Sequence, residues 1–339
     1  MKWLRKLLFP FSLIYGGLVF LRNKFYDWNW KKSEKFDFPV IVVGNLSTGG
    51  TGKSPMVEYL LKFLKQDYSV ASLSRGYKRK TKGFHELKGN ETADLTGDEP
   101  LQFKTKFPDV AVAVGENRRE GIQKLRQTDP KPEIIVLDDA FQHRKVSAGF
   151  SILLTTFVDL YCDDLILPAG NLRENRSGAK RADFIVVTKC PKNLGEGEKN
   201  KIRKRLSLKP HQELFFSHIE YANEVCFADA KRNLTDLKDF TLVTGIANPK
   251  PLKTHLKNLS LNFKHLKFPD HHSFTPKEIQ KLAREKLILT TEKDFMRLKN
   301  EASLKGKLGY LPIEIELDRG SEFQKTITSF IENDLKAGF

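Results

Sequence analysis

The segment FPVIVVGNLSTGGTGKSP, residues 38–55, indicates the architecture of the chain. Residues 38–43 are apolar and mostly β-branched, and such a run is typical of a strand buried in a parallel sheet. A glycine-rich segment follows at 44–52, and apolar residues then recur at helical spacing between 56 and 64. A strand, a glycine-rich loop and a helix in this order predict a phosphate-binding loop.

The chemistry of this loop suits a triphosphate. Glycines let consecutive backbone N–H groups turn toward phosphate oxygens, and the helix N-terminus adds positive partial charge. Lys53 is expected to reach the β- and γ-phosphates, and Ser54 to offer its hydroxyl to Mg²⁺. The usual pattern has glycine where this chain has Ser47, and Gly49 and Gly50 are expected to supply the missing flexibility. The predicted nucleotide-binding residues are Ser47, Thr48, Gly49, Gly50, Thr51, Gly52, Lys53 and Ser54.

A second buried strand, residues 133–137, leads into the adjacent Asp138 and Asp139. Carboxylates at a strand end beside a phosphate loop hold Mg²⁺ directly or through water, so both are predicted metal ligands. Arg75 and Arg118 follow two other predicted strands, whose ends line the same crevice of a doubly wound sheet. They are candidates for phosphate neutralisation, with a solvated surface charge as the alternative for each.

Composition narrows the class of protein. The 339 residues suggest about two domains, and the formal net charge of +16 implies a partner of opposite sign. Nucleic acid, an anionic membrane and a phosphorylated substrate all satisfy that requirement. Three cysteines with no close pair favour reduced thiols over a disulfide framework or a zinc site.

The amino terminus predicts an interfacial membrane anchor. Residues 7–21 are nearly all apolar, and basic residues and tryptophans flank them. As a helix this run would reach about 22 Å, short of the roughly 30 Å hydrocarbon core, so it is expected to lie in the interface. A cleaved signal peptide and an ordinary buried helix remain alternatives. The flanking residues are Lys2, Trp3, Arg5, Lys6, Arg22, Lys24, Trp28 and Trp30.

A set of motifs in one order resembles the tetraacyldisaccharide 4′-kinase family, the lipid A kinases. The resemblance implies transfer of the γ-phosphate of ATP, with Mg²⁺, to the 4′-hydroxyl of a tetraacyldisaccharide 1-phosphate. It also implies a peripheral or monotopic enzyme at the cytoplasmic face of the Gram-negative inner membrane. A monomer with no nucleic-acid partner is expected. The motifs are residues 44–55, 96–100, 138–144, 168–174, 245–249, 268–274 and 291–294.

The same resemblance implies the fold. It predicts two P-loop NTPase-like, RecA-like α/β/α domains joined by a short β linker, with an amino-terminal membrane-associated helix. The expected boundaries are 1–36 for the helix, 37–210 for the P-loop kinase domain, 211–228 for a two-stranded linker and 229–339 for the second α/β domain.

Further residue roles are implied by the resemblance. Asp98 matches the candidate base and His271 the residue that orients it, with Asp270 beside that histidine. From the residues alone, Asp98 would be a turn or N-cap aspartate. Glu174 is expected to join Ser54, Asp138 and Asp139 around the metal, and His143 and Arg173 to join Arg75 and Arg118 near substrate or phosphate.

Two other classes of protein compete with a lipid kinase. A nucleic-acid ATPase would suit the net charge, but the basic residues are scattered rather than interleaved with aromatics. A GTPase switch would carry an aspartate two residues after Lys189, where this chain has Pro191.

Overall fold

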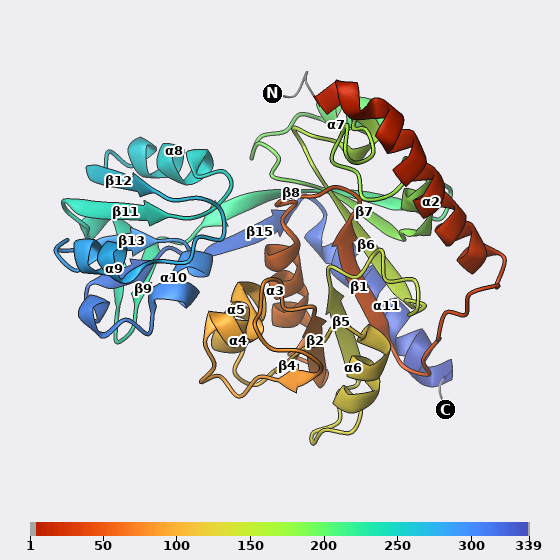
Figure 1. Ribbon diagram of the computed structural model, residues 1–339, viewed down its shortest axis with the longest axis horizontal. Helices are drawn as coiled ribbons and strands as arrows, with labels where there is room; N and C mark the ends of the chain where they lie inside the picture. Colours follow the sequence, from red (N-terminus) through yellow and green to blue (C-terminus); the bar gives the residue numbers. More distant parts are fainter. Residues whose placement is uncertain (1–4, 338–339) are drawn as a thin grey trace.

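The computed structural model describes residues 5–337, which form two α/β lobes built on separate sheets (Figure 1). Lys2 and Trp3, which were expected near lipid headgroups, lie outside the described residues. Among the described residues, no helix has both the length and the apolar character that crossing a bilayer requires.

The first lobe contains a nine-stranded sheet in the order β15-β8-β7-β6-β1-β5-β2-β4-β3. The strands between the two edges run parallel, and the edge strands β15 and β3 pair antiparallel with their neighbours. The bounds are β1 Val40–Asn45, β2 Val70–Ser74, β3 His85–Glu86, β4 Ala111–Val114, β5 Ile134–Asp138, β6 Phe150–Thr156, β7 Phe184–Thr188, β8 Glu213–Tyr221 and β15 Ile313–Leu317.

Helices cover both faces of this sheet, and a separate apolar core fills each side. Every residue of β1 is buried, as expected for a central parallel strand. Side chains of α3, α5 and α11 enter one core, and those of α6 and α7 enter the other. The bounds are α3 Lys53–Leu64, α4 Ala93–Thr96, α5 Asp98–Lys106, α6 Arg118–Leu125, α7 Glu196–Leu206 and α11 Gly320–Ala337.

The second lobe contains a six-stranded sheet in the order β10-β9-β14-β13-β11-β12. Strands β14, β13, β11 and β12 are parallel, and β9 and β10 extend the sheet antiparallel. The bounds are β9 Glu224–Phe227, β10 Lys231–Asn233, β11 Phe240–Thr244, α8 Lys250–Asn258, β12 Phe263–Lys267, α9 Pro276–Leu282, β13 Ile288–Thr290, α10 Glu292–Leu298 and β14 Leu308–Tyr310.

The expected domain boundaries require two corrections. The predicted linker has two strands, but β8 belongs to the first sheet and β9 to the second. The predicted second domain, 229–339, ends too late, because β15 and α11 return to the first lobe. Phe323, Ile327 and Ile331 of α11 are completely buried there. Apolar spacing predicts a strand or a helix but does not say which sheet it joins.

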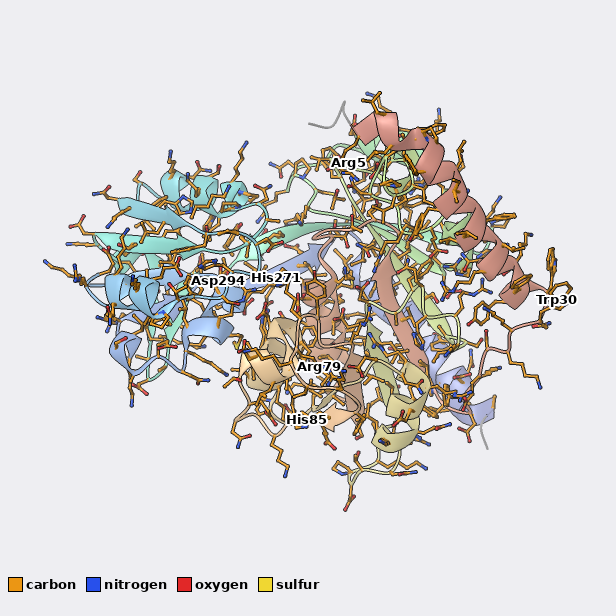
Figure 2. The ribbon with its side chains drawn as sticks, viewed as in Figure 1. Arg5, Trp30, Arg79, His85, His271 and Asp294 are labelled. Carbon is orange, nitrogen blue, oxygen red and sulfur yellow. The ribbon has the colours of Figure 1, made fainter. Side chains whose placement is uncertain are left out.

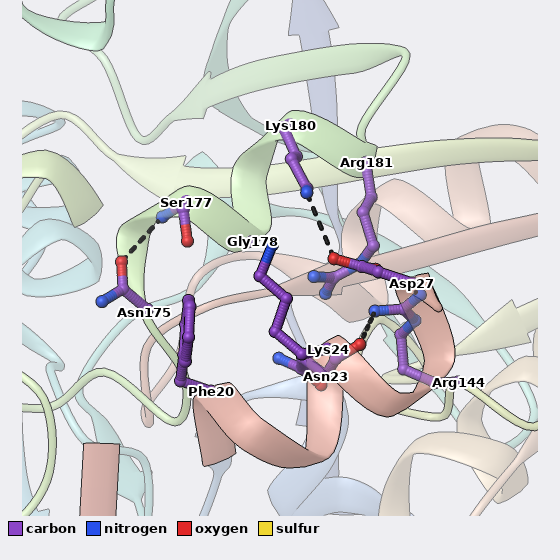
Figure 3. A pocket seen from close by; sticks show the side chains of 10 residues that line it. All are labelled: Phe20, Asn23, Lys24, Asp27, Arg144, Asn175, Ser177, Gly178, Lys180 and Arg181. Carbon is purple, nitrogen blue, oxygen red and sulfur yellow. Dashed lines mark hydrogen bonds and ion pairs between the residues drawn. The ribbon is translucent and has the colours of Figure 1, made fainter. Parts of the chain in front are cut away.

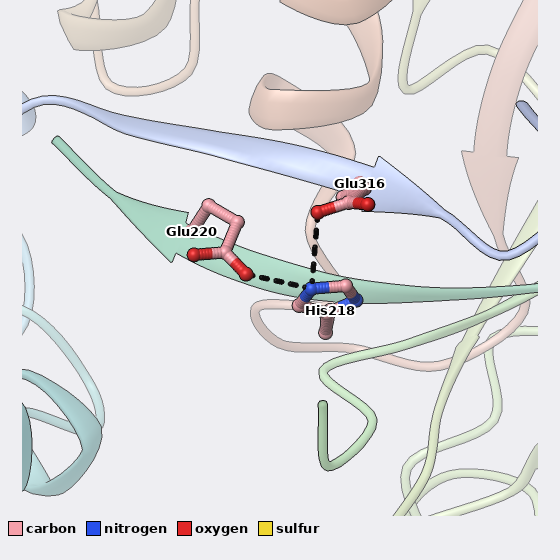
Figure 4. Close-up of side chains that lie close together, drawn as sticks. All are labelled: His218, Glu220 and Glu316. Carbon is pink, nitrogen blue, oxygen red and sulfur yellow. Dashed lines mark hydrogen bonds and ion pairs between the residues drawn. The ribbon is translucent and has the colours of Figure 1, made fainter. Parts of the chain in front are cut away.

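An antiparallel ribbon of β8 and β15 connects the two lobes (Figure 1). Part of this ribbon carries His218, whose Nε2 lies 2.8 Å from Glu220 Oε1 and 3.4 Å from Glu316 Oε2 (Figure 4). Lys192 also pairs with Glu220, at 2.5 Å. The connection is therefore a narrow, charged ribbon.

The amino-terminal helix α2, Phe9–Asp27, lies along the first lobe (Figure 1). Ser12 is buried and donates to the carbonyl of Ile166 at 3.1 Å, while its hydroxyl accepts from the amide of Ala169 at 2.9 Å. The alternative of an ordinary buried helix is wrong, because most of its apolar side chains are exposed. These are Phe9, Phe11, Leu13, Ile14, Leu18, Phe20 and Leu21, preceded by Leu7 and Leu8.

Candidate active site

The phosphate loop lies between β1 and α3 and is held from both sides. Asn45 donates through Nδ2 to the hydroxyl of Thr51 at 2.7 Å, and Thr188 donates to the carbonyl of Thr51 at 2.8 Å. Gly49 and Gly52 have φ angles of 113° and 87°, in the left-handed region that glycine adopts without strain. The loop therefore has the backbone form that its composition predicted.

Ser47 occupies the position where the usual pattern has glycine, and the fold explains why serine is accepted. Ser47 pairs with Leu172 in a single antiparallel bridge, and the amide of Thr48 donates to the carbonyl of Asn171 at 2.8 Å. The beginning of the loop is thus held in extended pairing. Of the two glycines expected to compensate, Gly49 has a positive φ and Gly50 does not.

The phosphate loop and the acidic strand end come together as predicted. The sheet register pairs Val43 of β1 with Asp138 of β5, and Lys53 Nζ lies 3.7 Å from Asp139 Oδ1. Ser54 is buried in the first turn of α3. The described residues therefore place a lysine, a hydroxyl and two carboxylates at one edge of the sheet.

The pKa values of the two aspartates shift in opposite directions. Burial, followed by the neighbouring Asp139, raises the pKa of Asp138 to about 6. Burial alone would also raise the pKa of Asp139, but Lys53 and Arg173 together hold it below its ordinary value. Asp138 accepts from Ser74 at 3.3 Å through Oδ2, whereas its Oδ1 is buried without a hydrogen-bond partner. A buried carboxylate oxygen without a hydrogen-bond partner fits a bound Mg²⁺.

Two of the predicted arginines face this acidic edge. Arg173 donates to both oxygens of Asp139, at 2.8 and 3.2 Å, and to the carbonyl of Asn45 at 3.0 Å. Arg118 is buried at the start of α6 and donates to the carbonyl of Asp138 at 3.2 Å. Burial lowers the pKa of Arg118 to about 10, so it remains charged at pH 7. Arg75 is exposed in the loop after β2.

His143 lies in a different environment from the phosphate loop. Burial, followed by the positive charge of Arg118, lowers its pKa to about 4, so the ring is neutral at pH 7. Its Nε2 is buried without a hydrogen-bond partner. The ring lines a cavity of about 190 Å³ together with Phe141, Arg144 and Val146. No contact in the described part of the chain joins it to Lys53.

Glu174 is placed in a network that does not include the other predicted metal ligands. Its Oε2 accepts from Asn23 of α2 at 2.8 Å, and its Oε1 accepts from Gln142 at 3.0 Å and from Arg181 at 2.8 Å. Within the described residues, none of these contacts reaches Ser54 or an aspartate of the acidic edge. Glu174 therefore connects the amino-terminal helix to the loop that carries Arg173.

A pocket of about 150 Å³ lies between α2 and this loop (Figure 3). Asp27 is the acidic residue in its lining, and it pairs with Arg144 at 2.9 Å and with Lys180 at 3.3 Å. The pocket is lined by Phe20, Asn23, Lys24, Asp27, Arg144, Asn175, Ser177, Gly178, Lys180 and Arg181.

The lobes meet at Asp98, the first residue of α5. Asp98 Oδ2 lies 3.0 Å from His271 Nδ1, and Arg297 Nε donates to Asp98 Oδ1 at 3.0 Å. A second nitrogen of Arg297 also contacts Asp98 Oδ2. Asp98 and His271, which are 173 positions apart in the sequence, are therefore paired, as the resemblance implied.

The environment of this pair determines the charge of Asp98. Burial alone would raise its pKa, but hydrogen bonds from His271 and Arg297 lower it to about 2. Asp270 is half exposed, and its Oδ1 lies 4.0 Å from His271 Nε2. The ring of Tyr77 meets His271 edge-on at 5.4 Å. Asp98 is thus an ionised carboxylate that contacts Arg297 through both oxygens and His271 through Oδ2.

Sequence reasoning missed Arg297, which completes this group. Arg297 follows Asp294 by one helical turn on α10, and the two pair at 2.9 Å. Asp294 is completely buried and also accepts from the amide of Gly245 at 2.8 Å. His271 and Asp294 lie close together on the side of the second lobe that faces α5 (Figure 2). The motif at residues 291–294 is part of the family resemblance, but nothing in it predicts that the next turn of α10 reaches Asp98.

Comparisons with known proteins identify the family of the chain. The family model described as tetraacyldisaccharide-1-P 4′-kinase matches residues 4–332. The chain is 49% identical to tetraacyldisaccharide 4′-kinase of Flavobacterium johnsoniae, across 99% of this chain and 100% of that protein. It is 43% identical to the protein of the same name from Bacteroides thetaiotaomicron, across 99% and 96% of the two chains.

A solved structure extends the likeness to three dimensions. The crystal structure of LpxK from Aquifex aeolicus in complex with ATP superimposes with a TM-score of 0.80 at 32% identity. The match covers 97% of this chain and 99% of that one. The chain belongs to the tetraacyldisaccharide-1-P 4′-kinase family.

Proposed function

We propose that the chain transfers the γ-phosphate of ATP to the 4′-hydroxyl of a tetraacyldisaccharide 1-phosphate between its two lobes. The activity is that of the family. The site assignment rests on the pairing of Asp98 with His271 and Arg297 across the two lobes. Within the first lobe, Lys53 lies near Asp139. A nucleic-acid ATPase and a GTPase switch are not favoured, because the kinase family matches the chain almost from end to end.

In the nucleotide half of the site, the loop amides and Lys53 bind and orient the β- and γ-phosphates. Ser54 and Asp138 are the residues that would hold Mg²⁺, which when bound neutralises charge on the phosphates. Arg173 keeps Asp139 oriented toward Lys53. Phosphoryl transfer depends mainly on positioning and charge, so these residues lower the barrier by preorganisation.

In the acceptor half, the paired Asp98 and His271 together act as the base that receives the proton of the sugar hydroxyl. A carboxylate with a pKa of about 2 is a weak base. The transition state of phosphoryl transfer is loose, so the hydroxyl loses its proton late, when a weak base suffices. Arg297 holds the carboxylate in place, and Asp270 faces the other ring nitrogen of His271.

We further propose that α2 holds the enzyme at a membrane surface, from which the acylated substrate is taken. Its outward face carries exposed Phe11, Leu13 and Leu18, and Trp30 lies beyond its end (Figure 2). Apolar side chains beside basic and tryptophan residues suit the headgroup layer. Leu13→Asp with Leu18→Asp is expected to lower partition onto anionic vesicles about tenfold, whereas Leu259→Asp on the second lobe leaves it unchanged. Equal partition of both variants would contradict the anchor.

The direct test of function supplies purified protein with Mg-ATP and a tetraacyldisaccharide 1-phosphate in detergent micelles. The expected product is the lipid with a second phosphate, on its 4′-oxygen, and Lys53→Met is the inactive control. Hydrolysis of ATP without phosphate on the lipid, or stimulation by DNA or RNA, would contradict the proposal.

A further inference from the structure

A buried ionic cluster outside the groups described above joins helices of both lobes. Lys106, at the end of α5, donates to Glu58 of α3 at 2.7 Å and to Glu292 of α10 at 3.0 Å. Its third contact is the carbonyl of Ile313, 3.5 Å away, where β15 begins its return to the first lobe. A lysine ammonium can donate three hydrogen bonds, and these three contacts reach three different elements.

Gln102 lies one turn earlier on α5 and forms a second bridge between the same helices. Its Nε2 donates to Glu58 Oε1 at 2.6 Å and to Glu292 Oε2 at 3.4 Å. Glu58 and Gln102 are 4% exposed and Glu292 is 5% exposed. Breaking such contacts leaves buried charge without compensation, so the cluster holds its members in one relative position.

The helices joined by this cluster are those that present the reacting groups. The helix α3 begins with Lys53, α5 begins with Asp98, and α10 carries Arg297. The separation between the nucleotide half and the acceptor half of the site therefore depends on how these helices are held together. In the described residues, Lys106 is the side chain that contacts both other helices by ion pairs.

The cluster places two carboxyl groups around one ammonium. Burial, followed by the charge of Glu58, raises the pKa of Glu292 to about 7, and burial raises that of Glu58. Burial alone would lower the pKa of Lys106, but the two carboxylates raise it above its ordinary value. Glu314 of β15 and Tyr310 of β14 also face these carboxylates. The ammonium therefore offsets the negative charge that the two carboxyl groups carry when they are ionised.

We propose that Lys106 is a positioning residue for the kinase reaction, which holds the nucleotide and acceptor halves of the site at a fixed separation. This inference rests on the proposed roles of Lys53 and Asp98 and extends them. Lys106 acts by fixing α10 against α3 and α5, so that Arg297 and His271 meet Asp98. Loss of the ammonium loosens the second lobe and leaves the phosphate loop unchanged.

The test separates turnover from nucleotide binding. Lys106→Met keeps most of the stem and removes the ammonium. We expect kcat to fall about tenfold or more, because misplacement of a reacting group by about 1 Å is costly, while KM and Kd for ATP change less than about twofold. Lys62→Met is the matched control, since it removes an exposed ion pair of α3 with Glu314, 2.7 Å apart, and leaves kcat within about twofold.

A second variant keeps the proposal testable if Lys106→Met folds poorly. The triple variant Lys106→Met, Glu58→Gln, Glu292→Gln removes the repulsion between unpaired carboxylates, so Tm returns toward that of the wild type. We expect kcat to stay low, because the ammonium bridge is still missing. Recovery of kcat together with Tm, or an unchanged kcat in both variants, would overturn the inference.

The outcome is distinguishable from a failure of the proposed function. An active Asp98→Asn variant alongside an impaired Lys106→Met variant would refute the acceptor assignment alone. An impaired Asp98→Asn variant alongside a fully active Lys106→Met variant would refute the positioning role alone.

Discussion

The proposed nucleotide half and the proposed acceptor half of the site are built in different ways. The first lies within one lobe, on the loops that follow the neighbouring parallel strands β1 and β5. The second joins Asp98 of the first lobe to His271 and Arg297 of the second, 173 and 199 positions away. A single sheet suffices to form the nucleotide half, whereas the acceptor half exists only when the lobes are in contact. Substitutions in the two halves should therefore have separable effects.

The largest effect is expected from Lys53→Met in the nucleotide half. Removal of a preorganised cation that faces the transferred phosphate should lower kcat about 1000-fold and also weaken ATP binding. Single-turnover transfer to lipid and equilibrium binding of ATP measure the two quantities. If ATP binding were unaffected, Lys53 would not contact the phosphates as proposed.

Asp138→Asn should lower kcat about 100-fold and stabilise the protein in the absence of Mg²⁺. The pKa of Asp138 is raised from 3.8 to about 6 on folding, so its ionised form opposes folding. The free-energy cost of ionising the buried Asp138 is absent below about pH 4, grows as pH rises and reaches its full size above about pH 6. The gain in Tm from Asp138→Asn should follow the same window in thermal melts with chelator. A gain of equal size at pH 4 and pH 8 would contradict the buried-charge argument.

Arg297→Lys should have a smaller effect, about tenfold on kcat, with ATP binding unchanged. Lysine keeps the charge, but it cannot reproduce the two-nitrogen contact with Asp98. The pH profile provides a second measurement: the pKa of Asp98, held near 2 by His271 and Arg297, should rise when the arginine is lost. Steady-state rates measured from pH 4 to 7 should therefore fall at the acidic end in the variant but not in the wild type. The same profile for both proteins would mean that Arg297 does not control the pKa of Asp98.

The two halves of the site also differ in how much of each could be predicted from the sequence. The phosphate loop and Asp138 were predictable because their signals are local, in the form of glycine spacing, a buried strand and an acid at its end. The pairing of Asp98 with His271 followed only from family resemblance, because no local pattern indicates which distant residues meet. Arg297 carries no signal of its own, since an arginine on a short helix is usually solvated.

Two further differences between the expected and the observed structure also arise from contacts between residues that are distant in the sequence. Glu174 was expected near the metal from the family resemblance, but its carboxylate accepts from Asn23 of α2, which is distant in the sequence. The adjacent Arg173 faces Asp139 instead. Residues 313–337 were assigned to the second lobe by order along the chain, although their apolar side chains complete the core of the first.

The most direct measurement compares ATP binding and phosphate transfer in Asp98→Asn. Kd for Mg-ATP should stay within about twofold of the wild-type value, because the nucleotide half lies in one lobe, while kcat for lipid phosphorylation should fall about 100-fold or more. Near-normal transfer by this variant, or loss of ATP binding along with transfer, would contradict a site divided between the lobes.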